Sequence, residues 1–256
     1  MMIVQRPANW LVVFGLLCGS CTKEEFTEPD VMHAVQATQA VPVDYIPVYD
    51  SSAAVLVAIA NYDYVDVNGV VTEQVTGLAR AVFPDANGNY INVGDVRSQD
   101  ISLNVGGENR YKLDPSASLP TGLNFISTPS YRWSVAGNAH FPSIDFICAT
   151  GFPVISEMVT SLPEIDRNSD FTFSTTVPVD DADSILFTVF AVNGYLFACK
   201  KGIHYSHTFT PAKLQLLASG NGYVRITAFN TVALEIQGKY VKYINQVVTT
   251  RAIAIR

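Results

Sequence analysis

Two cysteines in the second half of the chain, Cys148 and Cys199, carry side chains suited to covalent chemistry. Both lie in apolar stretches that are typical of β-strands. They could form a disulfide if the fold brings their Cα atoms within about 7 Å of each other. The alternative is a pair of buried thiols that pack as small hydrophobic side chains. The sequence leaves both interpretations open, because it supplies no distance between the two residues.

Histidines and carboxylates with metal-binding potential occur as the pair His204 and His207 and in two acidic clusters, residues 85–89 and 180–183. Residues three apart in an extended segment point to opposite faces, and no cysteine or carboxylate beside the histidines completes a zinc set. Neither cluster has the closing glutamate of a twelve-residue calcium loop. We interpret the histidines as loop residues and the clusters as solvated turns, and we predict no metal or other cofactor.

Motifs of the common catalytic sites are absent from the sequence: it has no Gly-x-Ser-x-Gly, no His-Glu-x-x-His, no phosphate loop and no Gly-x-Gly-x-x-Gly. Glu164 and Asp166 are two residues apart and could share one face of a strand. A glycosidase pair is defined by the distance between its carboxyl groups, which sequence does not give. We therefore predict no catalytic residue and lean toward a protein that is not an enzyme.

Aromatic side chains that could stack on a sugar ring occur at Tyr131 and Trp133. Tyr131, Trp133 and Val135 alternate with Arg132 and Ser134, which is typical of a strand with one buried face. The two rings are therefore a possible ligand platform, but the alternation favours a place in the core.

The first twenty residues have the three parts of an export signal. Arg6 supplies the positive charge, and residues 10–17 form an apolar stretch. This stretch is shorter than the roughly 20 residues that span a bilayer as a helix. Gly19 and Ser20 are the small residues that a signal peptidase requires, and Cys21 follows them.

The stretch Leu17-Cys18-Gly19-Ser20-Cys21 resembles the lipobox of bacterial lipoproteins, in which an apolar residue and two small residues precede the lipidated cysteine. The chain departs from the strict pattern at Cys18, where a leucine is usual. The resemblance implies that Cys21 becomes the first residue of the mature protein and carries diacylglycerol and palmitate. The alternative is an ordinary signal peptide cut elsewhere, with Cys21 as a plain thiol.

Lys23, Glu24 and Glu25 follow the cysteine and resemble the surface-export signal of Bacteroidota lipoproteins. That resemblance implies an outer-membrane lipoprotein that faces the cell exterior, with the outer membrane as its partner through the lipid anchor. The alternative is a solvated, charged start to a linker.

Charge excludes one class of partner. The chain has 16 basic and 23 acidic residues, a net charge of −7, and removal of the leader takes away only one charge, that of Arg6. An acidic chain is poorly suited to sequence-independent binding of phosphate backbones or to holding anionic lipid by charge. We expect no nucleic-acid partner.

The body is rich in Val, Ile, Thr, Phe and Tyr, which favours strands. Asn68-Gly69, Asn87-Gly88 and Asn193-Gly194 are typical of type I′ hairpin turns. Thr210 and Pro211 predict the start of one short helix, with Leu214, Leu217 and Ala218 on one face and Gly220 at its end.

We predict an all-β fold with two immunoglobulin-like β-sandwich domains after a flexible N-terminal tether. Residues 1–20 are the lipoprotein signal peptide, and residues 21–48 are the lipidated cysteine and the tether. Residues 49–142 and 143–256 are the two sandwiches. The Cys…Trp…Cys pattern of true immunoglobulin domains is absent.

These observations predict a non-enzymatic surface lipoprotein that acts as a binding or adhesion module, for a glycan or for a host or partner protein. The alternative is a structural subunit of a pilus or an accessory component of an outer-membrane complex. In that case the alternating run 247–255 would serve as a donor or edge strand. A hydrolase with an unrecognised site is the remaining alternative.

Overall fold

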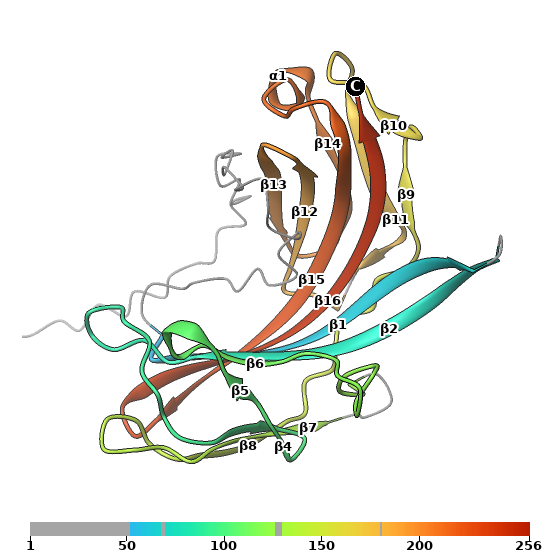
Figure 1. Ribbon diagram of the computed structural model, residues 1–256. Helices are drawn as coiled ribbons and strands as arrows, with labels where there is room; N and C mark the ends of the chain where they lie inside the picture. Colours follow the sequence, from blue (N-terminus) through green and yellow to red (C-terminus); the bar gives the residue numbers. More distant parts are fainter. Residues whose placement is uncertain (1–51, 68–69, 126–129, 180) are drawn as a thin grey trace, which may run out of the picture.

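The computed structural model describes residues 52–67, 70–125, 130–179 and 181–256, with only the backbone described at 63–67 and 70–73 (Figure 1). Apart from strands, these residues contain a four-residue α-helix, α1 (Pro211–Leu214), and one turn of 3-10 helix, η1 (Gly107–Asn109). The all-β prediction is confirmed. Within the same residues, no helix has the length and apolar character to cross a membrane.

One large sheet of nine strands forms the framework of the molecule. Its order is β13 (Gly194–Lys201), β12 (Ser184–Ala191), β15 (Gly220–Ile236), β16 (Lys239–Ile255), β1 (Ala54–Val67), β2 (Val70–Val82), β6 (Tyr111–Leu113) and β5 (Asn104–Val105), with β10 (Glu164–Ile165) paired to β16. β1 and β10 run parallel to β16, whereas the other neighbours are antiparallel.

β15 and β16 form a hairpin of two 17-residue strands. Gln237 and Gly238 connect them with φ angles of 49° and 75°, and a type I′ turn requires positive φ at both central residues. β16 is one continuous strand, because β15 pairs with it along its whole length and β1 pairs with it from Val241 to Thr250.

Most of the C-terminal run 247–255 is therefore interior to the sheet, contrary to the hypothesis that it is a donor or edge strand. β15 pairs with all of it on one side, and on the other side β1 pairs as far as Thr250 and β10 pairs with Ala254 and Ile255. An interior strand has its main-chain groups bonded within its own sheet and cannot offer them to a neighbouring molecule.

Two smaller sheets pack on the large one. The first has the order β4 (Ile101–Ser102), β3 (Val96–Ser98), β7 (Tyr131–Val135) and β8 (Ile144–Cys148), and the second has the order β14 (His204–Phe209), β11 (Phe171–Val179) and β9 (Met158–Thr160). β7 and β8 pair directly, from Tyr131 with Cys148 to Val135 with Ile144. The predicted domain boundary at residue 142 therefore lies inside a sheet.

Both smaller sheets cover the same face of the large sheet, which we call the outer face. Val241 and Tyr243 of β16 lie in the core beneath the four-stranded sheet, and Ile253 and Ile255 of the same strand lie in the core beneath the three-stranded sheet. Alternate residues of a strand share a face, so these odd-numbered residues all point to one side. Figure 1 shows the long strands bending, with β7 and β8 at one end and β9 and β11 at the other, both on the outside of the bend.

The opposite, inner face of the large sheet carries a third hydrophobic cluster. It consists of Val55, Val57, Ile59, Leu78, Val82, Leu186, Phe197, Phe229, Ile244 and Val248, with Tyr90, Tyr195 and Cys199 packed against it. The strand residues of this cluster come from β1, β2, β12, β13, β15 and β16. The large sheet is thus apolar on both faces over its central strands.

Two local predictions have different outcomes. The hairpin predicted at Asn193-Gly194 is confirmed, since β12 and β13 pair from Ser184 with Lys201 to Ala191 with Gly194. The helix is shorter than predicted, because Gly220 begins β15 instead of ending α1. Its start does not use the Thr210 hydroxyl; instead the Thr210 carbonyl accepts hydrogen bonds from the amides of residues 213 and 214.

Candidate functional site: an open strand edge

The short strand β9 is the end strand of the three-stranded sheet, and β11 is its only partner strand in the described part of the chain. The amide of Ser161 donates to the Thr172 carbonyl at 2.8 Å, and the amide of Thr176 donates to the Glu157 carbonyl at 3.0 Å. Main-chain groups of an antiparallel strand alternate between its two sides. The amides of Met158 and Thr160 therefore point away from β11, toward the open edge.

A groove of about 290 Å³ runs beside this edge, and we call it the β9 groove. It is lined by Glu157, Met158, Val159, Thr160, Ser161, Leu162, Pro163 and Arg251. Val159 and Leu162 are apolar and remain 43% and 41% exposed. Unpaired main-chain groups beside exposed apolar side chains are the features by which a sheet edge accepts an additional strand.

The charged residues of the β9 groove are Glu157 and Arg251, both exposed. Arg251 takes part in none of the described ion pairs. Its guanidinium is always charged and presents five donors. The groove thus combines main-chain hydrogen bonding, two apolar side chains and one cation that suits a carboxylate.

A second groove, of about 360 Å³, lies near the start of β1 and includes Asp85, His140 and Lys239. The Asp85 carboxylate already accepts the amides of Asn87 and Asn89 at 2.8 and 2.9 Å. These bonds lower the pKa of Asp85, with that from Asn89 the largest cause. The carboxylate therefore stabilises its own turn, as the sequence suggested, and the groove has no cluster of metal-ligating residues among those described.

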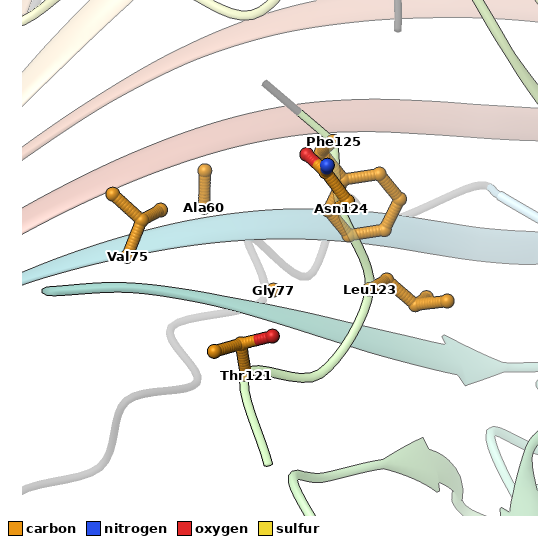
Figure 2. A pocket seen from close by; sticks show the side chains of 7 residues that line it. All are labelled: Ala60, Val75, Gly77, Thr121, Leu123, Asn124 and Phe125. Atoms are coloured by element: carbon orange, nitrogen blue, oxygen red, sulfur yellow. The ribbon is translucent and has the colours of Figure 1, made fainter. Parts of the chain in front are cut away.

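A third pocket, of about 220 Å³, lies where residues 121–125 cross β1 and β2 (Figure 2). Its side chains are those of Ala60, Val75, Thr121, Leu123, Asn124 and Phe125, with Gly77 at its floor. No lining residue is titratable. The crossing requires glycine, because a Cβ on Gly77 would lie 1.6 Å from the Leu123 carbonyl oxygen. We attribute a packing role to this pocket.

The possible ligand platform is not on the surface. Trp133 is 0% exposed and Tyr131 is 4% exposed, and both lie beneath the four-stranded sheet. The Tyr131 hydroxyl donates to the buried Asn245 side chain. Burial raises the pKa of Tyr131 well above its ordinary value. Neither ring presents a face on which a sugar could stack, so the alternation along β7 indicates core packing.

Cys148 and Cys199 are not joined by a disulfide. Cys148 is buried in β8, in the core between the four-stranded sheet and the outer face of the large sheet. Cys199 is half-buried in β13 and packs on the inner face. The two thiols thus lie on opposite sides of the large sheet, which a sequence cannot reveal.

The remaining candidate residues make local packing contacts, ion pairs or turn hydrogen bonds. His207 packs its ring against Phe187 and Phe209. Glu164 forms an ion pair with Arg256 at 2.8 Å. The Asp166 carboxylate accepts the Asn168 amide at 2.9 Å within a turn, and this hydrogen bond is the main cause of its lowered pKa.

The second acidic cluster also bonds to backbone. Asp181 accepts the Val154 amide at 3.1 Å, and Asp183 accepts the Thr231 amide at 2.6 Å. Cys21 and the export-signal residues Lys23, Glu24 and Glu25 lie outside the described residues.

Sequence reasoning missed the β9 groove. The signal was weak: the nine residues between Pro153 and Pro163 include four β-branched residues, which favour strands. Proline is confined to the ends and edges of sheets because it cannot donate to the ladder. This spacing could have indicated an edge strand, but not which neighbour it would lack.

No protein-family model and no curated protein matches the chain.

Proposed function

We propose that the protein is a lipid-anchored binding module of the outer cell surface, which holds an extended segment of a partner protein along β9. The observation that carries this proposal is the open β9 edge beside a groove that exposes both apolar and charged side chains. A strand added there would gain main-chain hydrogen bonds for affinity and contacts with Val159 and Leu162 for specificity. Arg251 would favour a partner segment that contains an acidic residue.

The anchor is part of the same proposal. A thioether-linked diacylglycerol at Cys21, followed by Lys23, Glu24 and Glu25, would hold the β body on the exterior of the outer membrane. Cells grown with labelled palmitate should label the wild-type protein and leave Cys21→Ser unlabelled. Label that persists in Cys21→Ser, or that is absent from the wild type, would remove the anchor from the proposal.

The binding role is tested by a substitution that removes one hydrogen-bond donor from the open edge. Thr160→Pro deletes an amide that points away from β11, so the bonds between β9 and β11 remain. Thr160→Val keeps the amide and serves as the matched control. Displayed random peptides selected on the immobilised protein should bind the control as they bind the wild type.

The same peptides should bind Thr160→Pro at least about tenfold more weakly, which corresponds to about 1.4 kcal/mol. Arg251→Gln should weaken selectively those peptides that contain an acidic residue. Equal affinity for wild type and Thr160→Pro, in a protein that remains folded, would show that β9 is not the binding edge.

If the protein is instead a structural subunit, its contacts with neighbouring molecules would have to use a strand other than β16. Since β16 is interior, an assembly of copies would also have to use an open edge, and β9 is the edge with a groove beside it. Concentration-dependent assembly of the purified protein that Thr160→Pro abolishes would favour this alternative over binding of a different protein.

A further inference from the structure

The β9 groove contains two charged side chains of opposite sign that do not neutralise each other. Glu157 and Arg251 both line the groove, and both are exposed. Neither side chain takes part in an ion pair among the described residues. The groove therefore offers one negative and one positive group to a bound partner.

Arg251 lies at a break in the cover of the large sheet. Its neighbours on the outer face of β16, Thr249 and Ile253, are 2% and 7% exposed, whereas Arg251 is exposed. On the other side of β16 from β15, pairing with β1 ends at Thr250 and pairing with β10 begins at Ala254. The Arg251 side chain therefore extends from the outer face into the space beside β9 and is not buried in either core.

Glu157 reaches the same edge from the opposite direction. Met158 is 4% exposed and belongs to the core beneath the three-stranded sheet, whereas Glu157 and Val159 are exposed. Side chains alternate along a strand, so Glu157 and Val159 point away from the large sheet. Arg251 belongs to the large sheet and approaches the edge from beneath. The two charges thus flank the open edge of β9 on its two faces.

We propose that the β9 groove selects an extended partner segment in which a basic and an acidic residue stand one or three positions apart. This inference rests on the proposed function and specifies the chemistry of the partner. A strand added beside β9 has side chains that alternate between the same two faces. Its basic residue would point outward to meet Glu157, and its acidic residue would point inward to meet Arg251. Residues on opposite faces of a strand are an odd number of positions apart.

Other charge patterns fit the groove less well. A segment with acidic residues alone would bring a carboxylate beside Glu157, and a segment with basic residues alone would bring a cation beside Arg251; like charges at an interface are unfavourable. A base and an acid two or four positions apart share one face, so only one of them would meet its counterpart. Val159 and Leu162 suit an apolar residue between the two charges.

The first test compares the random peptides that are selected by the immobilised wild type, by Glu157→Gln and by Arg251→Gln. Peptides from the wild type should be enriched in a base and an acid one or three positions apart, but not two or four. Glu157→Gln should remove the enrichment of the base, and Arg251→Gln that of the acid. Glu235→Gln and Lys239→Gln remove one charge of each sign at exposed positions outside the groove, and their peptides should match those of the wild type.

The second test uses two synthetic peptides of identical composition, based on a selected sequence. A lysine and an aspartate stand three positions apart in one peptide and two apart in the other. The wild type should bind the first at least about threefold more tightly, as expected for exposed ion pairs. The difference should shrink in high salt, because salt screens exposed charges, and should vanish in the variant that combines Glu157→Gln with Arg251→Gln.

The outcomes separate this inference from the function on which it rests. Equal binding of the two peptides by the wild type, with binding still weakened by Thr160→Pro, would overturn the charge spacing and leave β9 as the binding edge. Selected peptides with charges two or four positions apart, or without a charge preference, would have the same meaning. A selection without binders, or binding that Thr160→Pro leaves unchanged in a folded protein, would overturn both proposals.

Discussion

The two cores on the outer face are held by different means. Beneath the four-stranded sheet the largest buried side chains are Trp133, Tyr131 and Tyr243, and the core also holds a polar residue, Asn245, which is 1% exposed and bonded to Tyr131. Asn245 accepts from the Tyr131 hydroxyl, and its amide donates to the Thr150 carbonyl at 2.5 Å and to the Gly151 carbonyl at 3.2 Å. Beneath the three-stranded sheet the large side chains are Phe171, Phe173, Phe187 and Phe209.

The difference shows that one large sheet can hold two smaller sheets by two kinds of interaction, directional hydrogen bonds in one core and ring packing in the other. Residues 131, 148–151 and 245 are distant in sequence, and directional hydrogen bonds to Asn245 specify how they meet. The phenylalanine core relies on ring packing, with Phe173 and Phe209 stacked at 6.0 Å between centroids. Directional hydrogen bonds to a buried side chain favour one arrangement, whereas aromatic packing tolerates adjustment.

Truncating the largest side chain of each core should have the largest effect. Trp133→Ala and Phe173→Ala should each lower the free energy of unfolding by about 3–5 kcal/mol. Because β15 and β16 contribute to both cores, urea denaturation should show one transition in each variant. Two separate transitions, with only one displaced by each substitution, would mean that the two cores are independent units.

Asn245→Leu should be the next most damaging change, at about 2–3 kcal/mol, because it leaves the Thr150 carbonyl and the Tyr131 hydroxyl without their partner. Tyr131→Phe combined with Asn245→Leu should cost less than the sum of the single variants, since both act on one network. Phe173→Leu keeps all hydrogen bonds and should cost less than about 1.5 kcal/mol. Additive costs for the first two substitutions would argue against a shared network.

Alkaline pH should affect the two cores unequally. Burial raises the pKa of Tyr131 and of Tyr243, and the described phenylalanine core contains no tyrosine. A phenol whose pKa is higher in the folded state stabilises the protein below the unfolded-state pKa of about 10, and the stability is lost as pH rises through the folded-state pKa.

Denaturation midpoints should therefore fall above about pH 10 in the wild type and fall less in Tyr243→Phe. The Tyr243 hydroxyl has no hydrogen-bond partner among the described residues, so this variant should be well tolerated at neutral pH. An alkaline fall that is identical in the two proteins would show that Tyr243 does not titrate with unfolding.

The smallest effect should come from the surface of the four-stranded sheet. Arg132 and Asp145 form two hydrogen bonds, at 2.6 and 2.5 Å, across β7 and β8, but both side chains are exposed. Exposed ion pairs contribute little because water and salt screen them. Asp145→Asn should leave the melting temperature nearly unchanged, and the difference should vanish in high salt. A large loss of stability would mean that this pair, rather than Asn245, fixes the sheet.

The sequence predicted correctly those features that depend on neighbouring residues within one strand or one turn. The alternation of Tyr131, Trp133 and Val135 placed these side chains inward, and the Asn193-Gly194 turn was recognised, because period-two patterning and turn chemistry are local. The leader and the lipid on Cys21 were also inferred from adjacent residues, and they stay predictions because these residues lie outside the described structure. The β9 groove could not be predicted, since an edge is defined by the neighbour that a strand lacks.

What the sequence by itself determined is that this chain forms strands, and which side chains of a strand such as β7 point inward. Only the tertiary structure decided that β16 is interior, that Cys148 and Cys199 lie on opposite sides of one sheet, and that β7 and β8 pair across the expected boundary. The physical reason is that strand formation follows from neighbouring residues. Sheet order and edges depend instead on pairings between distant segments, which side-chain periodicity does not encode.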